Sequence, residues 1–190
     1  MAKVYDRIDE TLARFLAAQH VFFVASAPLD GAGHVNLSPK GLDSFRLLDA
    51  RTVAYLDLTG SGIETAAHLR ENGRIVILFC AFEGTPKILR LQGRGEVVEP
   101  GDARFEPLAA RFPPLEGIRS VIVVSLERIS DSCGYGIPLY RYEGDRTQLL
   151  EWARRKGPAG LVQYQAENNR TSIDGIPGLR AARTREQGSA

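Results

Sequence analysis

The chain has 190 residues, of which 44% are hydrophobic and 25% are charged. These fractions are typical of a globular domain and exclude a mainly disordered or fibrous chain. The 24 Lys and Arg residues nearly balance the 23 Asp and Glu residues, so the composition gives no broad basic field for nucleic-acid binding. The longest apolar runs, such as residues 75–82, have the length of a strand and are too short to cross a membrane.

The N-terminal residues and the cysteines indicate the cellular compartment and whether a metal site is expected. Residues 1–12 contain no apolar leader, so we expect a cytoplasmic protein without a signal peptide. Cys80 and Cys133 lie far apart, neither belongs to a Cys-x-x-Cys motif, and the chain has three histidines. This pattern predicts no metal site.

In the first half of the chain, apolar residues at helical spacing predict a helix over residues 5–19. Runs of β-branched and aromatic residues separated by turn residues then predict strands. These strands are 20–27, 34–38, 45–48 and 52–58. The first two flank a glycine-containing turn and are predicted to form a hairpin. A short helix over residues 61–71 follows, and Asn72-Gly73 is predicted to end it.

The second half continues with strands and ends with a polar segment. The predicted strands are 74–82, 88–98 and 120–129. Helices are predicted over residues 102–112 and 145–156, the latter with Asp145 as N-cap. The last 30 residues are rich in Gly, Pro, Asn and Arg and are predicted to be irregular, with a mobile tail from Arg183.

The order of these elements predicts the fold class. A doubly wound parallel sheet needs a helix after nearly every strand, and this chain lacks those helices. Six or seven strands joined by short turns predict an antiparallel sheet that is closed or nearly closed as a barrel. We therefore expect a mainly β protein with some α structure (α+β), built as a six- to seven-stranded antiparallel split β-barrel with flanking short helices.

One candidate site lies where the strand 52–58 runs into residues 59–62 and then a helix. Gly60 and Gly62 would let the backbone approach a ligand closely, and a helix start offers amide donors to a phosphate monoester. Hydroxyl groups of Thr59, Ser61 and Thr65 would add donors. The alternative is an ordinary helix start with Ser61 as N-cap and Glu64 completing a capping box.

Two further segments carry charged residues at positions that could contact a ligand. Pro39 stiffens the exit of the strand 34–38, so Lys40 is held where its ammonium could pair with a phosphate or an anionic ring. The alternative is a solvated turn lysine. Arg90, Gln92 and Arg94 share one face of their predicted strand, which would face solvent, a ligand groove or another subunit.

Three segments together resemble a known family. They are VNLSPKG at residues 35–41, the strand–helix–strand segment at residues 53–79 and LQGRGEVV at residues 91–98. In this order they resemble the pyridoxamine 5'-phosphate oxidase-like flavoproteins, over about residues 5–130. The resemblance implies an FMN-binding split-barrel domain over residues 1–133, with residues 134–190 as a helical and irregular extension packed on it.

The resemblance also implies the positions of the FMN-binding residues. Lys40 matches a lysine near the flavin, and Leu58 and Thr59 match contacts to the flavin and its phosphate. The full predicted set is Asn36, Leu37, Ser38, Lys40, Leu58, Thr59, Ser61, Gly62 and Thr65. Where family members often bind phosphate with an Arg-Lys pair, this chain has Glu64-Thr65, so hydroxyl groups and backbone amides would have to hold the phosphate.

By resemblance, the protein is an FMN-dependent oxidoreductase that transfers hydride between FMN and a small-molecule substrate or NAD(P)H. It would be a homodimer with FMN at the interface, and no catalytic residue is identified. Pyridoxamine phosphate oxidase activity itself is not expected, because the C-terminal Arg- and Trp-rich signature is missing and the chain's one tryptophan is Trp152. The alternatives are a deazaflavin enzyme, a flavin- or haem-binding module or sensor without turnover, and an interaction domain with an empty groove.

Overall fold

The structure is a computed structural model that describes residues 3–180. In this range the strands are β1 (Val4–Tyr5), β2 (Phe22–Ser26), β3 (Asn36–Lys40), β4 (Phe45–Asp49), β5 (Thr52–Leu58), β6 (Arg74–Cys80), β7 (Ile88–Val98) and β8 (Ile118–Ser132). The helices are α1 (Glu10–Ala17), α2 (Glu64–Asn72), α3 (Phe105–Ala109) and α4 (Gln148–Asn168). The tail from Arg183, predicted to be mobile, lies outside the described residues.

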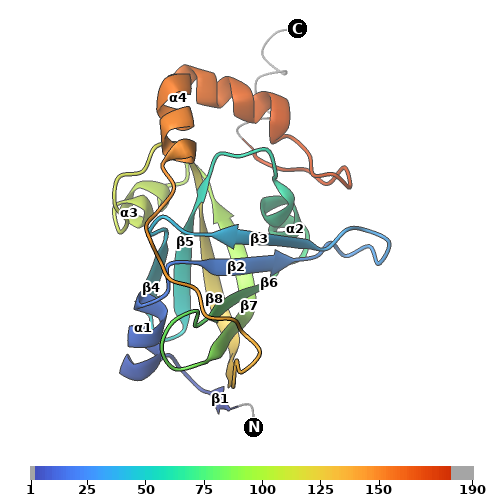
Figure 1. Ribbon diagram of the computed structural model, residues 1–190. Helices are drawn as coiled ribbons and strands as arrows, with labels where there is room; N and C mark the ends of the chain where they lie inside the picture. Colours follow the sequence, from blue (N-terminus) through green and yellow to red (C-terminus); the bar gives the residue numbers. More distant parts are fainter. Residues whose placement is uncertain (1–2, 181–190) are drawn as a thin grey trace, which may run out of the picture.

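The strands form one antiparallel sheet in the order β3-β2-β6-β7-β8-β5-β4, with β1 added on β8. Among the described residues, β3 and β4 are the two edges of this path and do not pair with each other. The sheet therefore curls into a barrel that stays open along one seam (Figure 1). The predicted split barrel with flanking short helices is confirmed, including the hairpin of β2 and β3.

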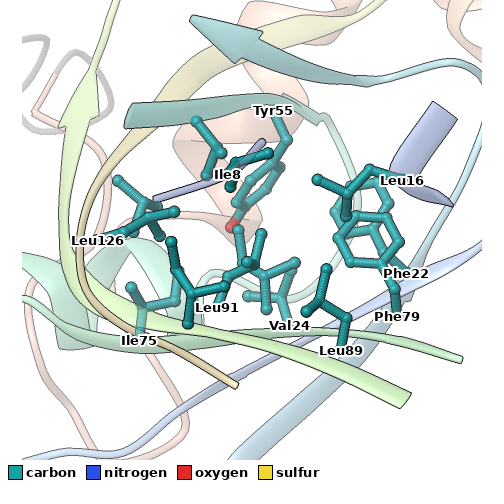
Figure 2. Packing of buried hydrophobic residues seen from close by; sticks show 14 of the residues in the cluster. Ile8, Leu16, Phe22, Val24, Tyr55, Ile75, Phe79, Leu89, Leu91 and Leu126 are labelled. Carbon is teal, nitrogen blue, oxygen red and sulfur yellow. The ribbon is translucent and has the colours of Figure 1, made fainter. Parts of the chain in front are cut away.

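The barrel interior is filled by side chains that alternate along the strands. In β2 and β6 every second residue points inward, as the buried positions of Phe22, Val24, Ile75, Ile77 and Phe79 show. Figure 2 shows side chains of β2 and β6 meeting those of β5, β7, β8 and α1. Period-two alternation is the pattern by which a sheet buries one face, and it is the pattern from which these strands were predicted.

The first helix is shorter than predicted. Tyr5, the first residue of the predicted helix, instead pairs with β8 together with Val4. The helix begins at Glu10, because the Asp9 side chain accepts a hydrogen bond from the Leu12 backbone N–H at 2.8 Å and caps it. Its buried residues, Leu12 and Leu16, were among those that predicted the helix.

The start of α2 differs from the capping-box alternative. Its N-cap is Ile63, and no side chain caps it. Ser61 lies two residues further out and makes no capping bond to the helix. The predicted end is confirmed, since Gly73 ends the helix in the left-handed conformation (φ 71°), which favours glycine.

The C-terminal helix starts later and runs further than predicted. Thr147, and not Asp145, is its N-cap, and the helix continues to Asn168 through part of the segment predicted to be irregular. A kink at Gly157 (φ 64°, ψ 171°) interrupts it directly before Pro158, because a proline disfavours helical geometry in the residue before it. Figure 1 shows α4 lying across one end of the barrel. No described helix is long and apolar enough to cross a membrane.

Candidate functional site

A cavity of about 260 Å³ lies where the end of β3, the end of β5 and the start of α2 meet. Seven of the nine predicted residues line it: Asn36, Ser38, Lys40, Leu58, Thr59, Gly62 and Thr65. The other two, Leu37 and Ser61, line an adjoining hollow together with Asn36 and Gly62. The sequence predicted two separate segments that could contact a ligand. In the structure both segments line one site.

A chain of polar side chains joins these two walls. The Ser38 hydroxyl donates to the Asn36 side-chain oxygen at 3.2 Å, and the Asn36 amide nitrogen donates to the Thr65 hydroxyl oxygen at 2.9 Å. Because Thr65 accepts from Asn36, its own hydroxyl hydrogen remains available to donate. This side of the cavity therefore offers a donor to a ligand that carries acceptor oxygens.

A buried ion pair forms the floor of the cavity. Arg119 Nε donates to Asp57 Oδ2 at 2.7 Å, and both side chains are 5% exposed. Lys40 Nζ lies 3.5 Å from the other carboxylate oxygen, and the Ser120 hydroxyl donates to Oδ2. Burial alone would raise the pKa of Asp57, but the charges of Arg119 and Lys40 and these hydrogen bonds outweigh it and lower that pKa.

Arg119 also fixes the loop between β5 and α2. Its Nη1 donates to the Gly60 carbonyl at 3.1 Å, and its Nη2 donates to the Gly62 carbonyl at 2.7 Å. Thr59 is tied in the same region, since its backbone N–H and its hydroxyl both donate to the Gly117 carbonyl. The loop that the sequence predicted to bind phosphate is therefore held in place by hydrogen bonds from side-chain donors.

Comparisons with known proteins identify the family to which this fold belongs. A family model described as pyridoxamine 5'-phosphate oxidase matches residues 8–133. The chain belongs to the pyridoxamine 5'-phosphate oxidase family. The pyridoxamine 5'-phosphate oxidase family protein ustO of Aspergillus flavus is 40% identical over an alignment of 195 residues, which covers 94% of this chain and 78% of that protein.

Two solved structures have the same fold as this family member. A single-substitution variant of HupZ from Group A Streptococcus is 26% identical, with a TM-score of 0.51 over 66% of this chain and 99% of that chain. A candidate pyridoxamine 5'-phosphate oxidase from Lactobacillus delbrueckii is 19% identical, with a TM-score of 0.50 over 67% of this chain and 98% of that chain. Both matches agree with the barrel described above.

Residues beyond the family model also contact the site. Asn169, which is fully buried, accepts from Arg119 Nη1 at 3.0 Å through its side-chain oxygen. Its amide nitrogen donates to the carbonyls of Gly60 and Ser61. Gln165 in α4 donates to the Thr59 hydroxyl at 2.8 Å. Thus the C-terminal segment holds the loop at residues 59–62 from the outside.

Two further contacts join the C-terminal segment to the cavity walls. Glu64, the first residue of α2, accepts from the Ile173 backbone N–H at 3.4 Å. Asp174 accepts from both the imidazole and the backbone N–H of His34, at the entry to β3. The hydrogen bonds from His34 lower the pKa of Asp174. Glu64 therefore anchors the C-terminal segment to the start of α2.

Sequence reasoning missed Asp57, Arg119, Gln165 and Asn169. Asp57 did leave a signal, because a lone carboxylate in an otherwise apolar strand has to find a buried partner. Arg119 precedes the apolar run of β8 in the same way. No local pattern marks Asn169 as a buried residue, since its partners lie more than a hundred positions earlier or on β8.

The other sequence candidates lie away from this cavity. Arg90 donates to the Ser132 hydroxyl and Arg94 to Glu127, both on the outer face of the sheet. Cys80 is buried, which raises the pKa of its thiol, and Cys133 is exposed; neither forms a disulfide. Within residues 3–180 no cluster of three or more His, Cys, Asp or Glu side chains could hold a metal ion.

Proposed function

We propose that the protein is a flavoprotein that binds FMN in this cavity and acts as an oxidoreductase, transferring hydride between FMN and a small-molecule substrate or NAD(P)H. Family membership supports a flavin. The observation that carries the proposal is the convergence of Lys40, Thr65 and the loop at residues 59–62 on one cavity.

The donor set fits a phosphate monoester attached to a ring system. The Thr65 hydroxyl hydrogen is available, and the start of α2 supplies amide donors and a partial positive charge. Glu64 also lines the cavity, and one of its carboxylate oxygens accepts from the Ile173 backbone N–H at 3.4 Å. Ser61, Gly62 and Thr65 would hold the phosphate, while Asn36, Leu37, Ser38 and Leu58 would lie along the ring.

Lys40 would place a positive charge beside the flavin. Bound FMN supplies the hydride-accepting and hydride-donating chemistry. The Lys40 side chain is 22% exposed and its ammonium lies 3.5 Å from the buried Asp57, so its position is set before any ligand arrives. A preorganised positive charge stabilises negative charge that develops on a neighbouring group. Lys40 would therefore favour the reduced, anionic flavin.

A second copy of the chain would complete the site. A cavity of about 260 Å³ is smaller than a usual small-molecule site of roughly 300–1,000 Å³. On the outer face of the neighbouring strands, half-buried apolar residues pair across β2 and β6: Phe23 with Leu78 and Ala25 with Val76. Leu37 on the edge strand β3 is 66% exposed. This apolar face suits a two-fold partner.

Anaerobic reduction of the reconstituted protein tests the oxidoreductase proposal. NADPH, NADH and dithionite are added separately to FMN-loaded protein, and the visible flavin absorbance is followed. Bleaching by a nicotinamide supports an enzyme, whereas bleaching by dithionite alone contradicts nicotinamide as the donor. Bound FMN that no donor of either kind reduces would contradict the redox role and favour a binding module.

A matched pair of lysine variants tests the role of Lys40. Lys87 Nζ lies 3.6 Å from Asp131, much as Lys40 Nζ lies 3.5 Å from Asp57, but Lys87 is outside the cavity. Lys40→Met is expected to lower the reduction potential of bound flavin, while Lys87→Met leaves it unchanged. Equal potentials in both variants would contradict the role of Lys40.

The proposed dimer is tested by sedimentation. Leu78→Glu places a charge on the outer face of β6 and is expected to convert a dimer to a monomer with weaker FMN binding. Val4→Glu, at a 50% exposed position of β1 away from this face, is the control. A wild-type protein that sediments as a monomer with FMN bound would contradict an interfacial site.

A further inference from the structure

Within the C-terminal segment, Asn169 contacts the proposed phosphate loop at its backbone, whereas Gln165 contacts the Thr59 hydroxyl. Asn169 contacts the Gly60 and Ser61 carbonyls, and Arg119 contacts the Gly60 and Gly62 carbonyls. Two side chains, one on β8 and one after α4, thus converge on three consecutive peptide groups. Asn169 and Arg119 are also hydrogen-bonded to each other at 3.0 Å, so they act as one unit.

These contacts determine which way the loop amides point. No cis peptide bond occurs among the described residues, and in a trans peptide the carbonyl and the following N–H point in opposite directions. Since the Gly60 and Gly62 carbonyls point toward Arg119, the N–H groups of Ser61 and Ile63 point away from it. Within residues 3–180, neither N–H donates a hydrogen bond to another protein group.

Close packing keeps Asn169 in place. Its backbone carbonyl accepts from the Leu179 N–H at 3.0 Å. A Cβ at Gly178 would come within 2.4 Å of that carbonyl oxygen and 2.7 Å of the Ile63 side chain. Only glycine leaves room for this approach. Leu179 is buried against Ile63, so the turn after Asn169 packs directly on the start of α2.

We propose that Asn169, acting with Arg119, is a positioning residue for the FMN phosphate: it fixes the loop at residues 59–63 so that the Ser61 and Ile63 amides can donate to the phosphate oxygens. The inference rests on the proposed function, because it assumes that FMN occupies the cavity. It assigns to the C-terminal extension, outside the matched residues 8–133, a part in cofactor recognition that replaces the missing basic pair.

The phosphate group can be isolated by comparing FMN with riboflavin, which has the same ring and lacks the phosphate. Wild-type protein, Asn169→Ala and the control Asn168→Ala are freed of cofactor and titrated with each ligand. Asn168 is the adjacent residue, and among residues 3–180 its side chain bonds only the Tyr164 carbonyl within α4. Melting temperatures and circular dichroism confirm that each variant is folded.

The expected result is a selective loss. Asn169→Ala should weaken FMN binding by about tenfold, the order expected for losing hydrogen bonds to a charged group, and should leave riboflavin binding unchanged. Hydrogen exchange at residues 61–63 should be faster in cofactor-free Asn169→Ala than in Asn168→Ala. If Asn169→Ala does not fold, Gln165→Ala removes the single bond to Thr59 and should give a smaller loss of the same kind.

Other results separate the two proposals. If wild-type protein binds FMN more tightly than riboflavin but both variants keep that preference, the role of Asn169 is wrong and the proposed function stands. If wild-type protein binds the two ligands equally, the loop does not hold a phosphate, which overturns the inference and the phosphate contacts of the proposed function but leaves flavin binding in place. If wild-type protein binds neither ligand, the proposed function fails and the inference falls with it.

Discussion

The barrel interior and the cavity floor are stabilised by different forces. Inside the barrel, buried aromatic and aliphatic side chains from α1, α2 and five strands pack together. The floor, a few residues further along β5, is built from the buried pair of Asp57 and Arg119 and from side-chain bonds to loop carbonyls. Apolar packing depends on volume, whereas the floor depends on charge and direction.

Because of this difference, the barrel interior and the cavity floor should tolerate different substitutions. A substitution that conserves shape should be mild inside the barrel, because the neighbours still fill the same space. The same kind of substitution in the floor should be severe, because it leaves a buried charge unpaired. Four substitutions or conditions test this contrast, beginning with the largest expected effect.

Asp57→Asn keeps the shape of the side chain and removes its charge. Arg119 would remain buried without its counter-ion, and breaking a buried pair in this way costs about 3–5 kcal/mol of unfolding free energy. Denaturant unfolding measures the loss. Asp43→Asn, which alters an ion pair with a largely exposed carboxylate, is the control and should change little. Similarly small losses of unfolding free energy in both variants would contradict the proposed difference between the cavity floor and the barrel interior.

Leu91 tests the interior, where it is fully buried. Leu91→Ala removes volume that the neighbours cannot refill and is expected to cost about 2–5 kcal/mol. Leu91→Met roughly conserves volume and should cost less than about 1.5 kcal/mol. The two variants are compared by the same unfolding measurement. If Leu91→Met lost as much unfolding free energy as Asp57→Asn, the interior would be as sensitive to a shape-conserving substitution as the floor.

Acid should weaken the floor before it affects the interior. The pKa of Asp57 is lowered from 3.8 in the folded chain, so its contribution to stability is complete above pH 3.8 and is lost as the pH falls through the lowered value. Unfolding free energies of wild type and Asp57→Asn measured at decreasing pH should converge below this range. Curves that stay parallel would rule out Asp57 as a source of the acid sensitivity.

His34→Ala is expected to have the smallest effect on overall stability. It removes the imidazole contact with Asp174 between the β3 entry and the C-terminal segment but keeps the bond from the backbone N–H of residue 34. The His34 side chain is mostly exposed, so water screens the pair. The unfolding free energy should be unchanged within error. Hydrogen exchange at residues 170–178 should nevertheless become faster, and unchanged exchange there would show that this contact does not hold the segment.

The strands could be predicted because their information is local. Alternating burial in β7, from Ile88 to Val98, appears directly as alternation of apolar and polar residues, and the predicted bounds are those of the structure. The helix ends were less predictable. The 5–19 helix was predicted five residues too early, because periodicity continues through a capping residue such as Asp9, and Asp145 was chosen as a cap although the helix begins only after Thr147.

The cavity was predictable in part for the same reason. Lys40 and Thr65 stand next to breaks in local pattern, a proline and a glycine-rich loop, and both line the cavity. Arg119 and Asn169 could not be found in this way, because their roles depend on partners that only the folded chain brings together. Long-range bonds from a side chain to a carbonyl leave no periodic signal in the sequence.

The most direct test of flavin binding is an absorbance spectrum of the protein purified without added cofactor, repeated after addition of FMN and removal of the unbound excess. We expect flavin bands in the visible and near-ultraviolet regions that stay with the protein through desalting. A folded protein that remains colourless after reconstitution would leave the barrel as described and contradict the proposed role of the cavity.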